Sequence, residues 1–244
     1  MQDVNVFGFI GDSFEETSTS ASDFARALKE ADGDDVTIHI NSCGGDVFDA
    51  QTMAETLRAY RGRTTASIEG LAASSASFFA LTADEVVINP SALMMIHNPY
   101  TLAMGNADEM RKTADYLDKV RDTIAGQYVR KSGADVEDIY KMMDEETWFS
   151  AREAIEMGLA DRMSDAAPVA ACITPKALKS FANAPADLTD QEPTSDEPET
   201  AEGAGDTEST IPEADEAEPE TGAVDGDTGA VSRTVCVNGQ FLTY

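Results

Sequence analysis

The amino-acid sequence predicts an α/β fold for the larger, N-terminal part of the chain, followed by an acidic segment without a core. From Val4 to Asp161, short stretches of alternating apolar residues are interleaved with longer stretches in which apolar residues recur at helical spacing. Strands that alternate with helices are typical of a sheet with both faces covered. Beyond about residue 165 the composition changes, and positions 180–232 contain no Lys or Arg. We expect a folded domain over residues 1–165, a disordered acidic segment over 166–232 and a terminal hairpin over 233–244.

Charge and composition exclude several classes of protein. The 244 residues include 46 acidic and 17 basic residues, and the net charge of −29 repels nucleic acid. No apolar run is long enough to span a membrane, and the N-terminal residues lack the basic region of a secretion signal. The cysteines, Cys43, Cys172 and Cys236, fit neither a metal site nor a disulfide framework. We expect a soluble cytoplasmic protein that uses no cofactor, metal, nucleic acid or membrane.

The individual elements follow from local patterns. Helices are expected where apolar residues recur every three or four positions, and two helix starts carry capping signals. These are Ser20 with Asp23, and Ser150 with Glu153 in a capping box. The strands are short alternating or apolar runs bounded by turn residues. We expect strands at 4–10, 36–40, 84–89 and 91–96, and helices at 21–31, 47–60, 106–130, 136–143 and 150–158.

The stretch from Thr65 to Leu81 is the centre of the functional prediction. It begins as a strand and meets Gly70. It continues as an apolar, alanine-rich run that predicts a buried helix with Ser74 and Ser75 in its first turn. A helix N-terminus presents unpaired N–H groups and partial positive charge, which stabilise the negative charge formed when a serine attacks a carbonyl. The alternative is that small residues here only allow close helix packing.

Two further motifs bear on this chemistry. Residues 41–46, N-S-C-G-G-D, place paired glycines between a strand and a helix, where a peptide N–H can point at an oxyanion or the chain can simply turn. His97 ends a strand, and a histidine pKa near neutrality suits a general base for a neighbouring serine. The alternative is a histidine that satisfies buried carbonyl groups. His39 lies on the opposite face of its strand and is a weaker candidate.

The C-terminal end carries a separate prediction. Asn238 and Gly239 lie between V-C-V and Q-F-L, which is a strong local signal for a β-hairpin. An isolated hairpin is only marginally stable in water. We therefore expect this hairpin to dock on the folded domain or on a partner.

Four motifs together carry a resemblance to a known family. I-N-S-C-G-G-D, G-L-A-A-S-S-A-S, M-M-I-H-N-P and T-W-F-S-A-R-E-A-I-E-M-G-L-A-D occur in the order and at the spacing of the Clp protease proteolytic subunits (ClpP). The sequence most resembles the ClpP-like head maturation (prohead) proteases of tailed bacteriophages. The resemblance covers residues 4 to about 163. It implies a ClpP/crotonase-type domain built from a spiral of β-β-α repeats.

The resemblance also implies the residues of a serine protease site. Ser74, which follows G-L-A-A, takes the position of the nucleophile, and His97 takes that of the base. The backbone N–H groups of Gly45 and Ser75 take the positions of the oxyanion donors. Glu146 takes the position of the third triad member, with Asp144 as the alternative.

The sequence departs from the family pattern at several positions. Cys43 replaces a proline before the glycines, Glu146 replaces an aspartate, and P-Y-T-L-A-M-G-N replaces a glycine-rich strand after the histidine. The chain also begins too late for the N-terminal extension with which ClpP meets its ATPase partner. We therefore expect an ATP-independent serine endopeptidase that forms homo-oligomeric rings and cleaves capsid or scaffold precursors.

Three other functions stay open on the sequence. They are a bacterial ClpP-like housekeeping peptidase, a crotonase-fold enzyme acting on coenzyme A thioesters, and a non-enzymatic scaffold whose acidic tail is the working part. Crotonases also use paired N–H groups as an oxyanion hole but need no Ser–His pair. Ser74 and His97 together therefore weigh against that alternative.

Overall fold

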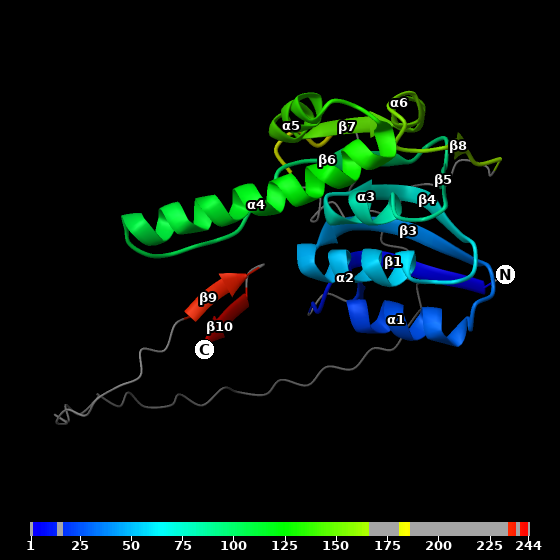
Figure 1. Ribbon diagram of the computed structural model, residues 1–244, viewed down its shortest axis with the longest axis horizontal. Helices are drawn as coiled ribbons and strands as arrows, with labels where there is room; N and C mark the ends of the chain where they lie inside the picture. The colour runs from blue at the N-terminus through cyan, green and yellow to red at the C-terminus, as the bar shows by residue number, and fades with distance from the viewer. Residues whose placement is uncertain (1, 14–16, 166–180, 186–233, 238–239, 244) are drawn as a thin grey trace, which may run out of the picture.

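The computed structural model describes residues 2–13, 17–165, 181–185, 234–237 and 240–243 (Figure 1). Apart from residues 181–185, the acidic segment predicted to be disordered lies outside these ranges. Strands and helices alternate along the first 165 residues, as expected for an α/β domain. Within the described residues, no helix has the length and apolar character required to cross a membrane.

In the described part of the chain, eight strands form one mostly parallel sheet. Its main path runs through β2 (Ser18–Thr19), β1 (Gln2–Ile10), β3 (Val36–Gly45), β4 (Thr64–Ala73), β5 (Glu85–Ile88) and β8 (Arg162–Met163). Off this path, β6 (Leu93–Ile96) pairs with β4, and β7 (Thr147–Ser150) pairs antiparallel with β6. The sequence did not predict β2, β7 and β8, and of these β2 and β8, with two residues each, are too short to show a period of two.

Most helices lie where the sequence predicts them. They are α1 (Ala21–Glu30), α2 (Val47–Arg58), α3 (Ser75–Ala80), α4 (Ala107–Ser132), α5 (Val136–Asp144) and α6 (Ala151–Glu156). The predicted caps form, since the Ser20 side chain accepts from the Asp23 N–H, and Ser150 and Glu153 make a reciprocal capping box. The starts of α4 and α6 lie one residue from the prediction, whereas α3 begins only at Ser75, well past the predicted start after Gly70. The start of α3 determines the geometry of the candidate site.

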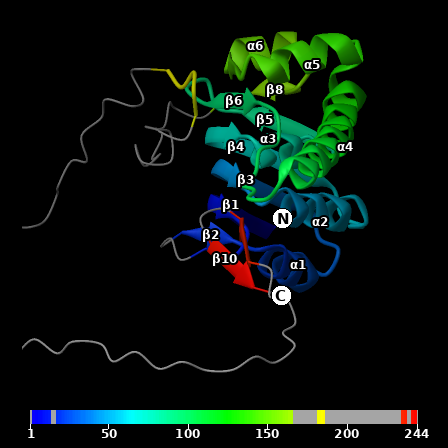
Figure 2. The ribbon, with the colours of Figure 1, turned by 90° about the vertical axis from the view of Figure 1, so that its left-hand side faces the viewer.

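Helices α1, α2 and α3 cover the same face of the sheet, so within the described residues the prediction of a sheet with both faces covered does not hold (Figure 2). The strand order β1-β3-β4-β5 advances in one direction without reversing. Because crossovers between parallel strands are right-handed, this order places every connecting helix on one side. The residues of β3 accordingly alternate between buried and partly exposed. The second face carries polar side chains such as His39, whose Nδ1 lies 2.7 Å from Glu69 Oε1.

The hydrophobic core lies between these helices and the sheet. Phe24 of α1 and Phe79 of α3 pack edge to face with ring centroids 5.2 Å apart, and both rings are fully buried. Met53 of α2 and Ile38 of β3 are fully buried as well. This packing fixes α3 against the sheet and so fixes the turn that leads into it.

Strand β4 changes partner along its length, and this change sets up the candidate site. Residues Thr65–Ile68 pair with β5, whereas Leu71–Ala73 pair with β6. The strand therefore continues past Gly70, where the sequence predicted a helix, and α3 begins only at Ser75. A short, continuous apolar run has no periodicity that separates a buried strand from a buried helix. The pairing with β6, together with the pairing of Ala72 with Ser42 of β3, makes this run a strand.

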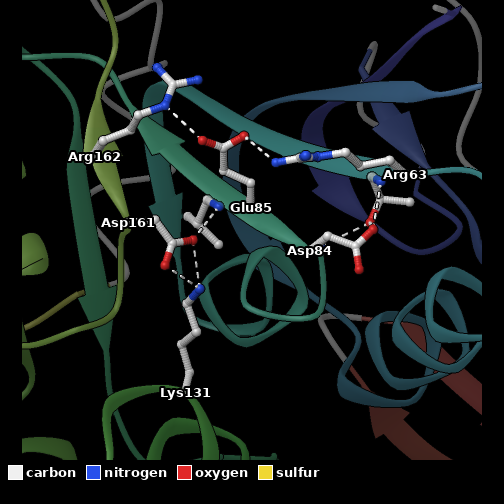
Figure 3. A network of polar contacts seen from close by, with 8 residues as sticks. Arg63, Asp84, Glu85, Lys131, Asp161 and Arg162 are labelled. Atoms are coloured by element: carbon white, nitrogen blue, oxygen red, sulfur yellow. Dashed lines mark hydrogen bonds and ion pairs between the residues drawn. The ribbon is translucent and has the colours of Figure 1, made fainter.

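At the opposite end of the strands, ion pairs join the starts of β4 and β5 to β8 and α4 (Figure 3). Glu85 accepts from Arg162 at 2.7 Å and pairs with Arg63 at 3.3 Å. The hydrogen bond from Arg162 lowers the pKa of the Glu85 carboxyl. Lys131 on α4 pairs with Asp161 at 2.7 Å. These contacts hold the edge strand and the long helix in place, away from the strand ends that carry the candidate site.

Near the C-terminus, β9 (Thr234–Val237) and β10 (Gln240–Thr243) pair antiparallel, as the hairpin prediction requires. The predicted turn residues 238–239 lie outside the described residues. What the hairpin docks on stays a prediction.

Candidate active site

Strand register brings the predicted site residues to one place. The ends of β4 and β6 pair, and the Ser74 N–H donates to the Met95 carbonyl at 3.0 Å. Because Ser74 follows β4 and His97 follows β6, the two side chains leave neighbouring strand ends. Strand β7 runs antiparallel to β6, and its register places position 146 beside position 97. Three stretches that are far apart in the sequence therefore meet at one edge of the sheet.

Ser74 occupies a strained turn between β4 and α3. Its φ is 54° and its ψ is −125°, a conformation that costs a residue with a side chain on the order of 1–3 kcal/mol. Its Oγ lies 2.7 Å from His97 Nε2. Strain of this kind persists only where the surrounding structure holds it, and a sharp turn from strand to helix is typical of a nucleophile elbow.

The neighbouring Ser75 is placed differently. It is 1% exposed, and in the described part of the chain no group hydrogen-bonds its Oγ. The two serines are therefore not equivalent. The hydroxyl of Ser74 meets the histidine, whereas that of Ser75 is enclosed in the protein.

The paired glycines pack closely around this turn. Gly44 has a φ of 88°, and a Cβ there would lie 2.8 Å from Ser74 Cβ, closer than real Cβ atoms approach. Gly45 packs against β1, where a Cβ would lie 2.2 Å from the Ile10 carbonyl oxygen. The Gly44 N–H already donates to Ser42 Oγ at 3.1 Å. This engagement of Gly44 is consistent with Gly45, rather than Gly44, as the oxyanion donor that the sequence predicts.

His97 is partly enclosed, and its surroundings favour the neutral ring. The imidazole packs edge to face against Tyr100 and Phe181, with ring centroids 5.8 Å and 5.6 Å apart. Burial lowers the pKa of His97 from its ordinary value of 6.5, and the negative charge of Glu146 opposes that shift. A neutral imidazole with Nε2 on the Ser74 hydroxyl is the form that a general base needs.

Glu146 adjoins His97 through the backbone, but its carboxylate is bonded elsewhere. Trp148 Nε1 donates to Glu146 Oε1 at 3.2 Å. The backbone N–H groups of Ala182 and Asn183 donate to its Oε2 at 2.9 Å and its Oε1 at 2.6 Å. Among the residues that the structure describes, no hydrogen bond joins this carboxylate to His97. In this arrangement Glu146 acts on the imidazole through its charge alone.

Asp144, the alternative orienting residue, is also bonded elsewhere. Its Oδ1 accepts from Asn98 Nδ2 at 2.8 Å and from Arg121 at 2.9 Å. The ion pair with Arg121 ties Asp144 to α4. Its charge is therefore offset by a neighbouring cation, whereas that of Glu146 is not.

Two parts of the site were not predicted as functional. Tyr100 belongs to the loop that the sequence identified only as a departure from the family pattern. Phe181 falls in the segment predicted to be disordered, and yet residues 181–185 lie against the site. The only signal in the sequence is one aromatic residue at the start of an acidic segment. That is too little to place it beside a histidine.

Two similarities connect the chain to known proteins. The family model described as Clp protease matches residues 9–167. The ATP-dependent Clp protease proteolytic subunit 1 of Protochlamydia amoebophila (strain UWE25) is 31% identical over 163 residues, which cover 64% of this chain and 78% of that protein. The ATP-dependent Clp protease proteolytic subunit of Oltmannsiellopsis viridis is 29% identical over 132 residues, which cover 53% of this chain and 68% of that protein. Because the family model matches well over half of its residues, this chain belongs to the Clp protease family.

Proposed function

We propose that this protein is a serine endopeptidase with Ser74 as the nucleophile and His97 as the general base. The observation that carries the proposal is the 2.7 Å contact between Ser74 Oγ and His97 Nε2 at the ends of two paired strands. The strained conformation of Ser74 and membership of the Clp protease family support it. The same membership weighs against the crotonase alternative.

The reaction follows from this geometry. Ser74 Oγ attacks the carbonyl carbon of the scissile peptide bond, while His97 Nε2 takes the hydroxyl proton. The N–H groups of Gly45 and Ser75 stabilise the oxyanion that forms. The tetrahedral intermediate collapses, His97 returns the proton to the leaving amine, and an acyl-enzyme remains on Ser74. Water, deprotonated by His97, then attacks the ester, releases the second product and restores the serine.

Glu146 is proposed as the group that orients the imidazole. Its backbone position opposite residue 97 and its effect on the pKa of His97 support this role. For a direct hydrogen bond from His97 Nδ1–H, the carboxylate has to turn away from its present donors, which are Trp148 Nε1 and the Ala182 and Asn183 N–H groups.

For substrates and assembly, we propose cleavage of capsid and scaffold precursors inside a phage procapsid, by a homo-oligomeric ring that works without an ATPase. The support is the likeness of the four motifs to head maturation proteases. The spiral of β-β-α repeats is part of the same proposal. The second candidate is a housekeeping peptidase, because both relatives are named as proteolytic subunits of an ATP-dependent Clp protease.

A fluorophosphonate probe tests the chemistry directly. The unmodified chain is expected to gain one covalent adduct on Ser74 and to cleave a small fluorogenic peptide. Ser74→Ala is expected to lose both properties while keeping its circular dichroism spectrum. Ser75→Ala is the matched control, and it is expected to keep most of the activity because Ser75 contributes a backbone N–H. Labelling of Ser74→Ala but not of Ser75→Ala would show that Ser75 is the nucleophile.

Coexpression with a phage capsid precursor protein distinguishes the two candidate functions. Intact-mass spectrometry of the capsid protein is expected to show a defined N-terminal or internal cut in the presence of the active chain. The Ser74→Ala chain is expected to leave the capsid protein whole. An uncut capsid protein alongside an active peptidase would favour the housekeeping function.

A further inference from the structure

A short segment from the C-terminal region, Phe181–Pro185, lies across the candidate active site. The ring of Phe181 stands edge to face against His97, with 5.6 Å between ring centroids and an interplanar angle of 81°. The same ring stands edge to face against Trp148 at 5.8 Å. Phe181 therefore covers the general base from the side of β7, the strand that carries Trp148.

Backbone groups of the segment also hold the carboxylate of Glu146. The Ala182 and Asn183 N–H groups donate to separate carboxylate oxygens, and the Asn183 side chain donates to the Glu145 carbonyl at 2.9 Å. Charge-assisted hydrogen bonds of this kind are stronger than neutral ones. They compete directly with the hydrogen bond that Glu146 would accept from the Nδ1–H group of His97 in a triad.

The segment completes its contact on an apolar surface beside the nucleophile. Phe181 and Ala184 pack on a small cluster of buried side chains near the ends of β4 and β6. Other partly buried residues pack on the same cluster. The buried members are Leu71, Ala73 and Met95, and the partly buried ones include Cys43, Leu93 and Trp148. Ala73 directly precedes Ser74, so a peptide bound here lies next to the reacting hydroxyl.

We propose that Phe181–Pro185 is an intramolecular inhibitor, which occupies the substrate side of the site and keeps Glu146 from His97. The proposal rests on the serine endopeptidase function. The ligand class of this surface is then a peptide segment whose aromatic side chain binds between His97 and Trp148. A substrate peptide that presents such a side chain displaces the segment and releases Glu146 to orient the base.

The contact is suited to reversible inhibition. Ala182 and Asn183 are exposed, and Phe181 is only partly buried, so the segment is held from one side. Because it is covalently joined to the domain, its effective concentration is on the order of millimolar even if its intrinsic affinity is low. A substrate therefore competes with a weak but always present ligand.

Two substitutions in the full-length chain test the inhibition. Phe181→Ala removes the aromatic contact, and Ala182→Pro removes one N–H donor to Glu146. Each is expected to raise kcat/KM for a small fluorogenic peptide by about tenfold, the size expected for one lost charge-assisted hydrogen bond or aromatic contact. Ala182→Ser keeps the N–H group and is the matched control, with kcat/KM close to that of the unmodified chain.

A second readout does not depend on activity. Trp148 is the only tryptophan in the chain, so intrinsic fluorescence reports directly on this surface. Phe181→Ala and Ala182→Pro are expected to shift its emission to longer wavelength because the indole becomes more exposed. A synthetic peptide of residues 179–187 is expected to reverse that emission shift in the Phe181→Ala variant. The same peptide is expected to inhibit the peptidase activity of this variant competitively, whereas a scrambled peptide has neither effect.

The possible outcomes separate this proposal from the proposed function. If Ser74 is labelled but both substitutions leave kcat/KM unchanged or lower it, the inhibitor proposal is overturned and the peptidase function stands. A cut within 181–185 in the unmodified chain would make the segment a substrate and also overturn the proposal. If no form of the chain is labelled or cleaves a peptide, the proposed function fails, and with it the inhibition.

Discussion

At the scale of single residues, the proposed chemistry depends on a strained serine, Ser74. Ser74 adopts a conformation that a residue with a Cβ avoids, and its side chain receives no capping hydrogen bond in return. Its contact with His97 Nε2 is the compensation that the structure shows. A position that only needed to connect a strand to a helix would favour glycine, which adopts this conformation without strain.

The role of Glu146 is testable by a paired substitution. Glu146→Gln is expected to lower kcat/KM on the order of 10⁴-fold if this carboxylate orients His97 as in the serine protease template. His97→Ala is expected to remove nearly all activity. Asp144→Asn is the matched control and is expected to stay close to the unmodified chain, because Asp144 is paired with Arg121. Near-normal rates for Glu146→Gln together with an inactive Asp144→Asn would assign the orienting role to Asp144.

The pH dependence of activity is expected to report the environment of His97. Burial lowers the pKa of this imidazole below 6.5, and the base must be neutral to accept a proton. The acidic limb of kcat/KM is therefore expected below pH 6.5, with activity lost as the pH falls through the lowered pKa. Glu146→Gln removes a charge that raises this pKa, so the limb is expected to move to still lower pH. A limb above pH 6.5 in the unmodified chain would contradict this prediction.

At the scale of elements, the turn between β4 and α3 depends on the glycine packed against it. A Cβ at Gly44 would meet the Ala73 carbonyl oxygen at 2.7 Å and Ser74 Cβ at 2.8 Å, at a φ of 88°. Neither neighbour is a flexible side-chain end, so the backbone has to shift.

Gly44→Ala is accordingly expected to destabilise the fold by roughly 1–3 kcal/mol and to lower peptidase activity, since it displaces Ser74, the proposed nucleophile. Urea unfolding measures the first effect. Gly126→Ala on α4 is the control, because Gly126 has open space around it and is expected to gain roughly 0.5–1 kcal/mol. Equal stability of the two variants would show that the turn tolerates a Cβ.

At the scale of the whole molecule, α4 extends beyond the sheet (Figure 1). None of its residues from 107 to 120 is fully buried, although Met110, Leu117 and Val120 follow the apolar spacing of the rest of the helix. The exposed rings of Phe48 and Tyr116 lie 6.4 Å apart beside them. This is more apolar surface than a monomer needs to leave uncovered.

We expect the full-length chain to form a large homo-oligomer at micromolar concentration, measured by multi-angle light scattering. Leu117→Glu places a charge on the apolar side of α4 and is expected to lower the molar mass. Asp118→Glu, a conservative change at an exposed neighbour, is the control. A fully active monomer would contradict the ring proposal.

The sequence by itself determined most of the local structure of this protein. Caps such as Ser20 and the Ser150–Glu153 box, and helical spacing, depend on residues close together in the chain, so they can be predicted from a window of sequence. The motifs around Ser74 and His97 also indicated the family, which the family model confirms.

Tertiary structure alone decided the features that depend on distant parts of the chain. The side of the sheet on which the helices lie follows from strand order, which no local pattern encodes. The path of the chain past Gly70 follows from pairing with β6. The position of Phe181 beside His97 depends on contacts with side chains on β4, β6 and β7, more than thirty residues away. Such contacts join residues that are far apart in the sequence. The sequence gives the identity of these residues, and only the folded chain determines which of them lie in contact.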